Sequence, residues 1–174
     1  MGTRLNPLTI ETPKSMLPMG DRPLLEIIVQ QLHDAGIRRV NFSVHHKSEK
    51  IAEHFGDGSE FGVDINYVTE DRPLGTAGGL GLIEQPKDTL LVMNGDILTQ
   101  VSFHDMLAYH RENNADLTVA VQQYNVELPY GVVECDGPAV RSLAEKPKIS
   151  FLVNAGMYLL EPVVHKFIPK DDSI

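Results

Sequence analysis

Cysteine and tryptophan are nearly absent from this 174-residue sequence, which has one cysteine, Cys135, and no tryptophan. A single thiol excludes a disulfide framework and a thiolate zinc cluster, and it favours a reducing compartment. Long hydrophobic runs are absent too, since none approaches the roughly 18 residues that a membrane-spanning helix needs. We therefore predict a cytoplasmic protein with no membrane partner.

Positive charge is also scarce, because the sequence has 15 lysines and arginines but 24 aspartates and glutamates, which gives a formal net charge of −9. General nucleic-acid binding needs a net basic face, so no nucleic-acid partner is expected. A local basic cleft is compatible with this balance, since charges outside it are screened within about 8 Å at physiological salt. Hydrophobic residues at 42% and charged residues at 22% are ordinary for a globular domain with a sizeable core.

What the sequence does have is an alternation of helix-like and strand-like segments over the first 115 residues. Apolar periodicity and capping residues predict helices at 22–35, 48–55, 76–83 and 102–113, and strands at 38–44, 64–70 and 89–96. The alternation implies parallel βαβ units. The nearly continuous apolar run at 89–96 predicts a strand buried on both faces of the sheet.

The character of the chain changes after residue 116. Four strand-like runs follow one another, at 116–123, 130–135, 139–145 and 151–160. Successive strands favour antiparallel pairing, so we expect a mainly parallel sheet with a small antiparallel part in the C-terminal half. Neither a linker nor an internal repeat interrupts the sequence, which predicts a single α/β domain over residues 1–174.

The first 14 residues have the composition of an anion-binding loop. Gly2 lets the backbone approach a phosphate, the Thr3 hydroxyl can donate, and Arg4 can bind phosphate oxygens through two nitrogens. Lys14 adds a second cation ten residues further on. An ordinary solvated tail has a similar composition, so this motif alone does not decide between the two.

A glycine-rich stretch, PLGTAGGLG at 73–81, lies between a predicted strand and a predicted helix. Small residues at such a junction let a flat ring lie against the backbone, and the amides at a helix N-terminus favour anions. The glycine spacing fits neither the G-x-G-x-x-G dinucleotide fingerprint nor a G-K-S/T phosphate loop. The alternative is a turn that needs glycine only for its backbone shape.

Asp96 ends the predicted strand at 89–96, at the edge where open α/β sheets bind ligands. Its carboxylate, with Gly95 allowing close approach, suits magnesium, which takes few protein ligands and leaves room for phosphate oxygens. A turn-forming role is the alternative for a single aspartate after a strand.

Polar residues with the chemistry of a sugar-phosphate site lie in the C-terminal half. Gly131 can offer an unhindered amide, Glu145 can accept from sugar hydroxyls, and Lys146 can meet a phosphate. Asn154 and Gly156 can complete a polyol site, although each of these residues is also an ordinary strand end. The histidine spacings do not favour shared metal ligation, and no Ser-His-Asp arrangement points to hydrolysis.

The chain resembles the sugar-1-phosphate nucleotidyltransferase family in seven ordered motifs: GTRLNPLT, PKSMLPMGDRPLLE, EDRPLGTAGGL, NGDIL, YGVVE, EKP and VNAGMYLLEP. The PLGTAGGL form is most similar to the branch of mannose-1-phosphate and amino-sugar-1-phosphate guanylyltransferases. This resemblance implies a Rossmann-like three-layer α/β domain. It also implies a magnesium-assisted transfer from a nucleoside triphosphate, GTP in that branch, to a sugar-1-phosphate, with release of pyrophosphate.

The resemblance implies a role for each matching residue. Arg4, Lys14 and Asp96 would be catalytic, with Asp96 holding Mg²⁺. The nucleotide would be bound by Gly2, Thr3, Gly75, Thr76, Ala77 and Gly78. The sugar would be bound by Gly131, Glu145, Asn154 and Gly156, and its phosphate by Lys146.

The sequence departs from the family pattern at both ends. Family members usually have a first strand and a glycine pair before the Gly-Thr-Arg step, and a second metal-binding aspartate beyond the Glu-Pro segment. We therefore expect a domain without the usual first strand and C-terminal portion, with low or no activity of its own. The alternative function is a non-catalytic sugar-nucleotide-binding or regulatory paralogue. A glycosyltransferase of related fold fits less well, because that class usually has two close acidic residues for its metal and NGDIL offers one. Whether the chain forms a homo-oligomer stays open.

Overall fold

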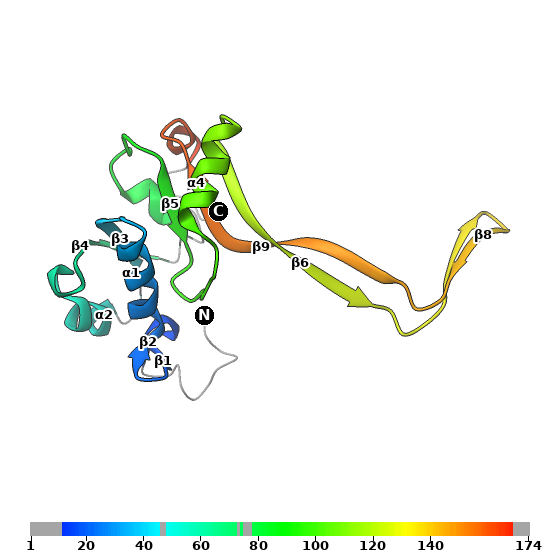
Figure 1. Cartoon of the computed structure of the whole chain (residues 1–174), viewed down its shortest axis with the longest axis horizontal. Helices are drawn as coiled ribbons and strands as arrows, with labels where there is room; N and C mark the ends of the chain where they lie inside the picture. The colour runs from blue at the N-terminus through cyan, green and yellow to red at the C-terminus, as the bar shows by residue number, and fades with distance from the viewer. Residues whose placement is uncertain (1–11, 46–47, 73, 75–77, 169–174) are drawn as a thin grey trace. The chain divides into compact units, whose positions relative to one another are not determined.

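The computed structural model describes residues 12–45, 48–72, 74 and 78–168 (Figure 1). The chain divides into two compact units. The first unit comprises residues 1–118 and 158–174, and the second unit comprises residues 119–157. That both units belong to one domain stays a prediction.

The first unit contains the alternating elements that the sequence predicts. Its described helices are α1 (Leu24–Asp34), α2 (Ser48–Phe55) and α4 (Phe103–Glu112), with 3-10 turns η2 (Lys14–Met16), η3 (Ser59–Phe61), η4 (Gly79–Leu82) and η5 (Val164–Phe167). Its strands include β1 (Pro18–Met19), β2 (Arg22–Pro23), β3 (Arg39–Val44), β4 (Asp64–Thr69) and β5 (Leu90–Met93). The predicted helices at 22–35, 48–55 and 102–113 and the three predicted strands are confirmed. The segment 76–83 contains η4 in its described part.

Local sequence explains where two of these helices begin or end. The Ser102 side chain caps α4 by accepting a hydrogen bond from the backbone N–H of Asp105 at 3.2 Å, as the capping residues predict. Gly36 follows α1 with a φ of +84°, a left-handed conformation that glycine adopts without steric cost. Short-range chemistry therefore sets the boundaries of α1 and α4.

The strands form small sheets rather than one large one. β3 and β4 pair in parallel, from Arg39 opposite Asp64 to Val44 opposite Thr69, which confirms one βαβ unit around α2. The other described sheets have the orders β1-β2, β5-β9-β6 and β7-β8. A mainly parallel sheet is therefore not seen among the described residues. One reason is that β9, from the end of the chain, lies between β5 and β6 and separates strands that are neighbours in sequence.

A hydrophobic core fills the first unit between α1, β3, α2 and β4. Its buried members are Leu25, Val29, Phe42, Val44, Ile51, Phe55, Val63 and Ile65. Phe42 and Phe55 meet edge to face with ring centroids 5.3 Å apart, a preferred aromatic geometry. This core holds β3 and β4 against α1 and α2.

The burial predicted for the strand at 89–96 is wrong. All four residues of β5 are half-buried instead of enclosed on both faces. The physical reason is the sheet order β5-β9-β6, which makes β5 an edge strand within the described part of the chain. Apolar content alone does not distinguish an edge strand from a central one.

The second unit is built from four strand segments, as the sequence predicts. They are β6 (Leu117–Glu127), β7 (Val132–Asp136), β8 (Ala139–Ala144) and β9 (Lys148–Leu160), of which β6 and β9 extend into the first unit. β7 and β8 form an antiparallel hairpin, and Gly137 turns it with a φ of +58°. The contacts of Glu127 with Lys148 at 3.6 Å and of Asn125 with Ser150 at 2.7 Å show that β6 and β9 also run antiparallel.

No helix in the described part of the chain is both long enough and apolar enough to cross a bilayer.

Candidate functional site

Two of the predicted catalytic residues, Lys14 and Asp96, contact one another in the first unit. Lys14 belongs to η2, and Asp96 follows the end of β5. The Lys14 Nζ atom donates to Asp96 Oδ2 at 2.5 Å, although 82 residues separate them in sequence. The two side chains remain 47% and 34% exposed, so other charged groups can approach the pair.

Gly95 lies where these distant segments meet. A Cβ atom at this position would lie 3.6 Å from Leu25 Cδ1 and 3.9 Å from Ser15 Cβ. The backbone after β5 is therefore in van der Waals range of both η2 and α1. The predicted role of Gly95, to let a metal ion come close to the Asp96 carboxylate, stays a prediction.

The chemistry of Asp96 fits magnesium as a single protein ligand. Magnesium is usually held by one or two carboxylates, with water and substrate phosphates completing an octahedral shell. Asp96 already attracts a cation, the Lys14 ammonium. Among the residues that the structure describes, no group of three or more His, Cys, Asp or Glu side chains could hold a metal ion. Any magnesium at Asp96 would therefore depend on phosphate oxygens for most of its ligands.

Part of the predicted nucleotide site falls outside the described residues, namely Gly2, Thr3, Arg4, Gly75, Thr76 and Ala77. Gly78 is described, and it has helical backbone angles of φ −64° and ψ −34° immediately before η4. Its neighbour Gly79 is buried, and a Cβ there would overlap the Ser43 hydroxyl. The segment after Gly78 thus packs tightly against the end of β3.

Glu70 holds this packing in place, and the sequence reasoning did not single it out. Its Oε1 accepts from Ser43 Oγ at 2.6 Å and its Oε2 accepts from the backbone N–H of Leu74 at 3.0 Å. The backbone N–H of Glu70 donates to Val44 O at 2.8 Å, so the residue itself is tied to β3. The available clue was an acidic residue directly after β4 and before the glycine-rich stretch.

The predicted sugar-phosphate residues lie in the second unit and form two local pairs. A Cβ on Gly131 would lie 3.3 Å from Glu145 Oε2, so this carboxylate rests against the glycine backbone. Asn154 Oδ1 accepts from the backbone N–H of Gly156 at 2.8 Å, and Gly156 has a φ of +70°. Lys146 also has a positive φ, +45°, which is uncommon for lysine. The roles of these residues stay predictions.

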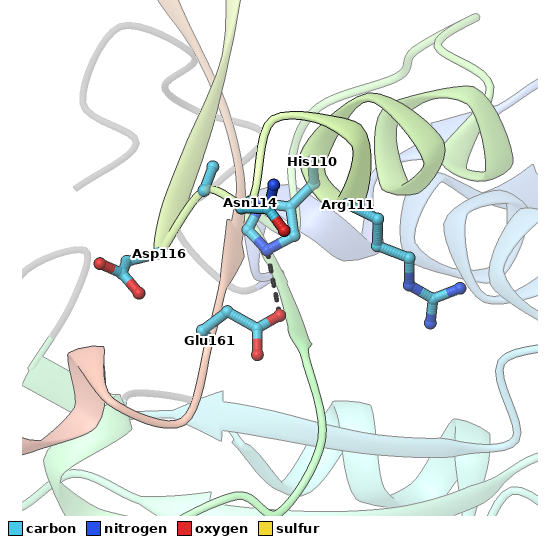
Figure 2. A pocket seen from close by; sticks show the side chains of 6 residues that line it. His110, Arg111, Asn114, Asp116 and Glu161 are labelled. Carbon is cyan, nitrogen blue, oxygen red and sulfur yellow. Dashed lines mark hydrogen bonds and ion pairs between the residues drawn. The ribbon is translucent and has the colours of Figure 1, made fainter.

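A pocket of about 350 Å³ opens at the end of α4 in the first unit (Figure 2). It is lined by His110, Arg111, Asn114, Ala115, Asp116 and Glu161. In Figure 2 the His110 ring faces Glu161, while the Arg111 side chain points away from that carboxylate. His110 is only 1% exposed, so its two ring nitrogens need protein partners.

Both His110 nitrogens find such partners. Nδ1 lies 2.7 Å from Thr118 Oγ1 and Nε2 lies 3.1 Å from Glu161 Oε1, which also accepts from Thr89 Oγ1 at 2.6 Å. The Thr89 hydrogen bond, followed by that of His110, lowers the pKa of Glu161. This polar network links four segments of the chain. His110 lies in α4, Thr118 in β6, Thr89 directly before β5 and Glu161 directly after β9. The histidine spacings gave no reason to select His110, although its position four residues after Met106 places it on the buried face of α4.

Comparison with known proteins identifies the class to which this arrangement belongs. The chain belongs to the nucleotidyl transferase family, whose sequence model matches residues 1–173. It is 37% identical to the mannose-1-phosphate guanylyltransferase of Mycobacterium tuberculosis over 179 residues, which covers 99% of this chain and 50% of that protein. It is 34% identical to the UTP–glucose-1-phosphate uridylyltransferase of Synechocystis over 188 residues, covering 97% of this chain and 48% of that protein.

A solved structure agrees with these matches. The putative glucose-1-phosphate thymidylyltransferase of Bacillus anthracis superposes with a TM-score of 0.74 at 26% identity, covering 95% of this chain and 70% of that one. The predicted family and the mixed α/β fold are therefore confirmed. The chain spans about half the length of the curated relatives that it matches.

Proposed function

We propose that this chain carries the nucleotide-binding and catalytic part of a sugar-1-phosphate nucleotidyltransferase. The observation that supports it best is the contact between Lys14 and Asp96, since a family member needs a cation and a metal-binding carboxylate together at the phosphates. GTP with mannose-1-phosphate is our first choice of substrates, because the relative at 37% identity is named for that pair. UTP with glucose-1-phosphate is the alternative that the second relative suggests.

The proposed reaction is an in-line displacement without a covalent enzyme intermediate. A phosphate oxygen of the sugar-1-phosphate attacks the α-phosphorus of the nucleotide, forming one P–O bond while the bond to the β-phosphate oxygen breaks. Pyrophosphate leaves with the electron pair, so no oxidant or external base is required. Catalysis then rests on positioning two anions and cancelling their repulsion.

The charged residues would divide this work between the two substrates. Lys14 would exchange Asp96 for a nucleotide phosphate oxygen, and Arg4 would bind the triphosphate with two nitrogens. Lys146 would bind the sugar phosphate. Magnesium bound to Asp96 would supply positive charge next to the triphosphate.

Neutral groups would orient the substrates. The backbone of Gly2, Thr3, Gly75, Thr76, Ala77 and Gly78 would contact the nucleotide. Gly131, Glu145, Asn154 and Gly156 would contact the sugar hydroxyls, and the Asn154–Gly156 hydrogen bond supports a fixed geometry for one of these pairs. A cytoplasmic location and the Rossmann-like three-layer arrangement stay predictions; the parallel pairing of β3 with β4 supports the latter.

The test is pyrophosphate release from GTP, UTP, ATP, CTP and dTTP, each with mannose-1-phosphate, glucose-1-phosphate or glucosamine-1-phosphate. We expect release that is low for this chain by itself, depends on both magnesium and sugar phosphate, and is largest for GTP with mannose-1-phosphate. Calorimetry with each nucleotide is run beside it. Nucleotide binding without pyrophosphate release from any pair would contradict the enzyme proposal and favour a non-catalytic sugar-nucleotide-binding paralogue.

A further inference from the structure

We propose that Gln31 is a positioning residue, whose side-chain amide anchors the loop that carries Asp96 and thereby sets how well magnesium binds there. The loop comprises residues 94–102, between β5 and α4. The inference rests on the proposed function, since it takes Asp96 to be the magnesium ligand. Gln31 lies outside the seven motifs quoted above, so the family resemblance assigns it no role.

The first support is that the loop meets α1 on both sides of Asp96. Gln31 Nε2 donates to Thr99 O at 3.0 Å, although 68 residues separate the two in sequence. A backbone carbonyl can only accept, so the amide nitrogen of Gln31 must face it. On the other side of Asp96, a Cβ on Gly95 would lie 3.6 Å from Leu25 Cδ1. α1 therefore contacts the loop one residue before Asp96 and three residues after it.

The second support is that α1 is a firm base for these two contacts. Leu25, Val29 and Leu32 of α1 are buried, and the first two belong to the hydrophobic core. An α-helix rises about 1.5 Å per residue, so Leu25 and Gln31 lie about 9 Å apart along the helix axis. Asp96 is therefore held between two points of one helix that packs on the core, in addition to its contact with Lys14.

The third support is that Thr99 also organises the rest of the loop. Its Oγ1 accepts from the backbone N–H of Val101 at 3.0 Å, and Ser102 caps α4 directly afterwards. The residue that Gln31 holds therefore connects the Asp96 part of the loop to the start of α4. The Val101 amide is also a reporter, because its hydrogen should exchange faster once Thr99 is released.

The other end of the Gln31 amide allows positioning to be separated from stability. Gln31 Oε1 is buried and has no hydrogen-bond partner among the residues that the structure describes. A buried acceptor without a partner disfavours folding. Gln31→Met keeps the length of the side chain and removes this oxygen together with the Nε2 donor. Thr99 is half-buried, so water can replace the lost donor, and the melting temperature should stay near that of the wild type.

The experiment measures Kd for GTP and for UTP by calorimetry, each with and without magnesium. For the nucleotide that the wild type binds, Gln31→Met should raise Kd in magnesium by about two- to tenfold, the scale of one neutral hydrogen bond. Without magnesium, the Kd of Gln31→Met should equal that of the wild type. An equal rise with and without magnesium would overturn the proposal, since the effect would not act through the metal ligand.

A double variant tests whether Gln31 acts through Asp96. Asp96→Asn removes the anionic ligand that the loop positions. In that background Gln31→Met should raise Kd no further, because a positioning residue acts only through the group that it positions. Losses that multiply in the double variant would contradict the proposal.

Gln30→Met is the matched control, since it makes the same change at the neighbouring position of α1. The Gln30 side chain is exposed, and its Nε2 donates to Asp34 Oδ1 at 2.8 Å within the helix, so this change leaves the loop contact intact. Its Kd should equal that of the wild type in magnesium. A rise as large as that of Gln31→Met would overturn the assignment to Gln31.

A second readout separates the failure of this inference from the failure of the proposed function. Hydrogen exchange at the Val101 amide should be faster in Gln31→Met than in the wild type, whereas Gln30→Met should leave it unchanged. Unchanged Val101 exchange in Gln31→Met overturns the anchor whether or not nucleotide binds. A wild-type chain that binds neither nucleotide contradicts the proposed function itself, and Val101 exchange then still decides whether Gln31 anchors the loop.

Discussion

The two units of this chain hold their predicted site residues by different physical means. In the first unit, Lys14 and Asp96 project from segments that pack on a hydrophobic core containing Leu25 and Phe42. In the second unit, Glu145 and Asn154 are exposed and rely on contacts with the nearby residues Gly131 and Gly156. Burial stabilises the first arrangement, and backbone pairing stabilises the second.

The difference teaches where substitutions are tolerated. Every residue of β8 is exposed, and large apolar side chains such as Tyr130, Leu143 and Leu152 are more than half exposed in the second unit. Two-stranded hairpins have little burial to stabilise them and are marginal in water by themselves. Changes in the second unit should therefore alter binding chemistry at little cost in folding free energy, whereas the first unit should be sensitive to both.

The largest expected contrast is between two phenylalanines. Phe42 is 8% exposed and contacts Phe55 and Tyr67, so Phe42→Ala should destabilise the chain by about 3–5 kcal/mol. Phe151 in the second unit is 50% exposed, and Phe151→Ala should change the free energy of unfolding by about 0.5 kcal/mol or less. Urea unfolding of both variants measures this contrast. Equal losses would show that burial does not distinguish the units.

The next contrast concerns chemistry instead of stability. Asp96→Asn should lower magnesium-dependent pyrophosphate release by about 100-fold, the scale of losing one electrostatic contact at a transition state. Its melting temperature should stay near that of the wild type, because the Lys14–Asp96 pair is substantially exposed and such pairs contribute little to stability. An unaltered magnesium dependence would remove Asp96 from the mechanism.

Two glycines with positive φ provide a smaller, matched contrast. Gly58 has a φ of +86°, and a Cβ there would lie 2.7 Å from Ile65 Cγ1 and 2.8 Å from Val63 O. Gly58→Ala should therefore destabilise by about 2–3 kcal/mol, from backbone strain and steric overlap together. Gly137 has a φ of +58° with nothing within 4 Å, so Gly137→Ala should cost only the backbone strain, about 1 kcal/mol. The comparison is made from melting curves, and a larger loss at Gly137 would contradict it.

The smallest expected effect is a pH dependence that arises in the first unit. The Thr89 and His110 hydrogen bonds lower the pKa of Glu161 in the folded chain, so the folded state binds fewer protons than the unfolded state in this range. The stabilisation is fully present above the ordinary glutamate pKa of about 4.3 and is lost as the pH falls through the lower folded pKa.

Thr89→Val tests this contribution, because it removes the largest cause of the pKa shift while keeping the side-chain volume. Its free energy of unfolding should fall less steeply with acidification than that of the wild type between about pH 5 and about pH 3. Glu161→Gln should flatten the same region further. A steeper acid dependence in Thr89→Val would contradict the sign of the linkage.

The sequence predicted best what short-range chemistry decides. The Ser102 cap, the Gly36 termination and the strand patterns of β3 and β4 all depend on residues that are close in sequence. It failed on the burial of β5, since β5 has a paired strand on one side only within the described part of the chain, and that strand, β9, comes from about 60 residues further along. Strand order is a long-range property that apolar content does not encode.

The candidate site shows the same division. Lys14 and Asp96 could each be selected from motifs, but their contact depends on the packing of η2 against the end of β5. Glu70 begins the motif EDRPLGTAGGL but was given no role there, and His110 lies outside the motifs. Each depends on a partner in another segment, Ser43 for Glu70 and Glu161 for His110.

The 82-residue separation of Lys14 from Asp96 has a consequence for synthesis of the protein. At translation rates of about 5–20 residues per second, Lys14 is made roughly 4–16 s before Asp96. Through that interval the growing chain contains a cationic N-terminal segment without the carboxylate it will contact. If the Lys14–Asp96 pair binds nucleotide as proposed, that binding must wait until β5 and Asp96 have been made. A ribosome-bound chain halted before Asp96 should then show no magnesium-dependent nucleotide binding.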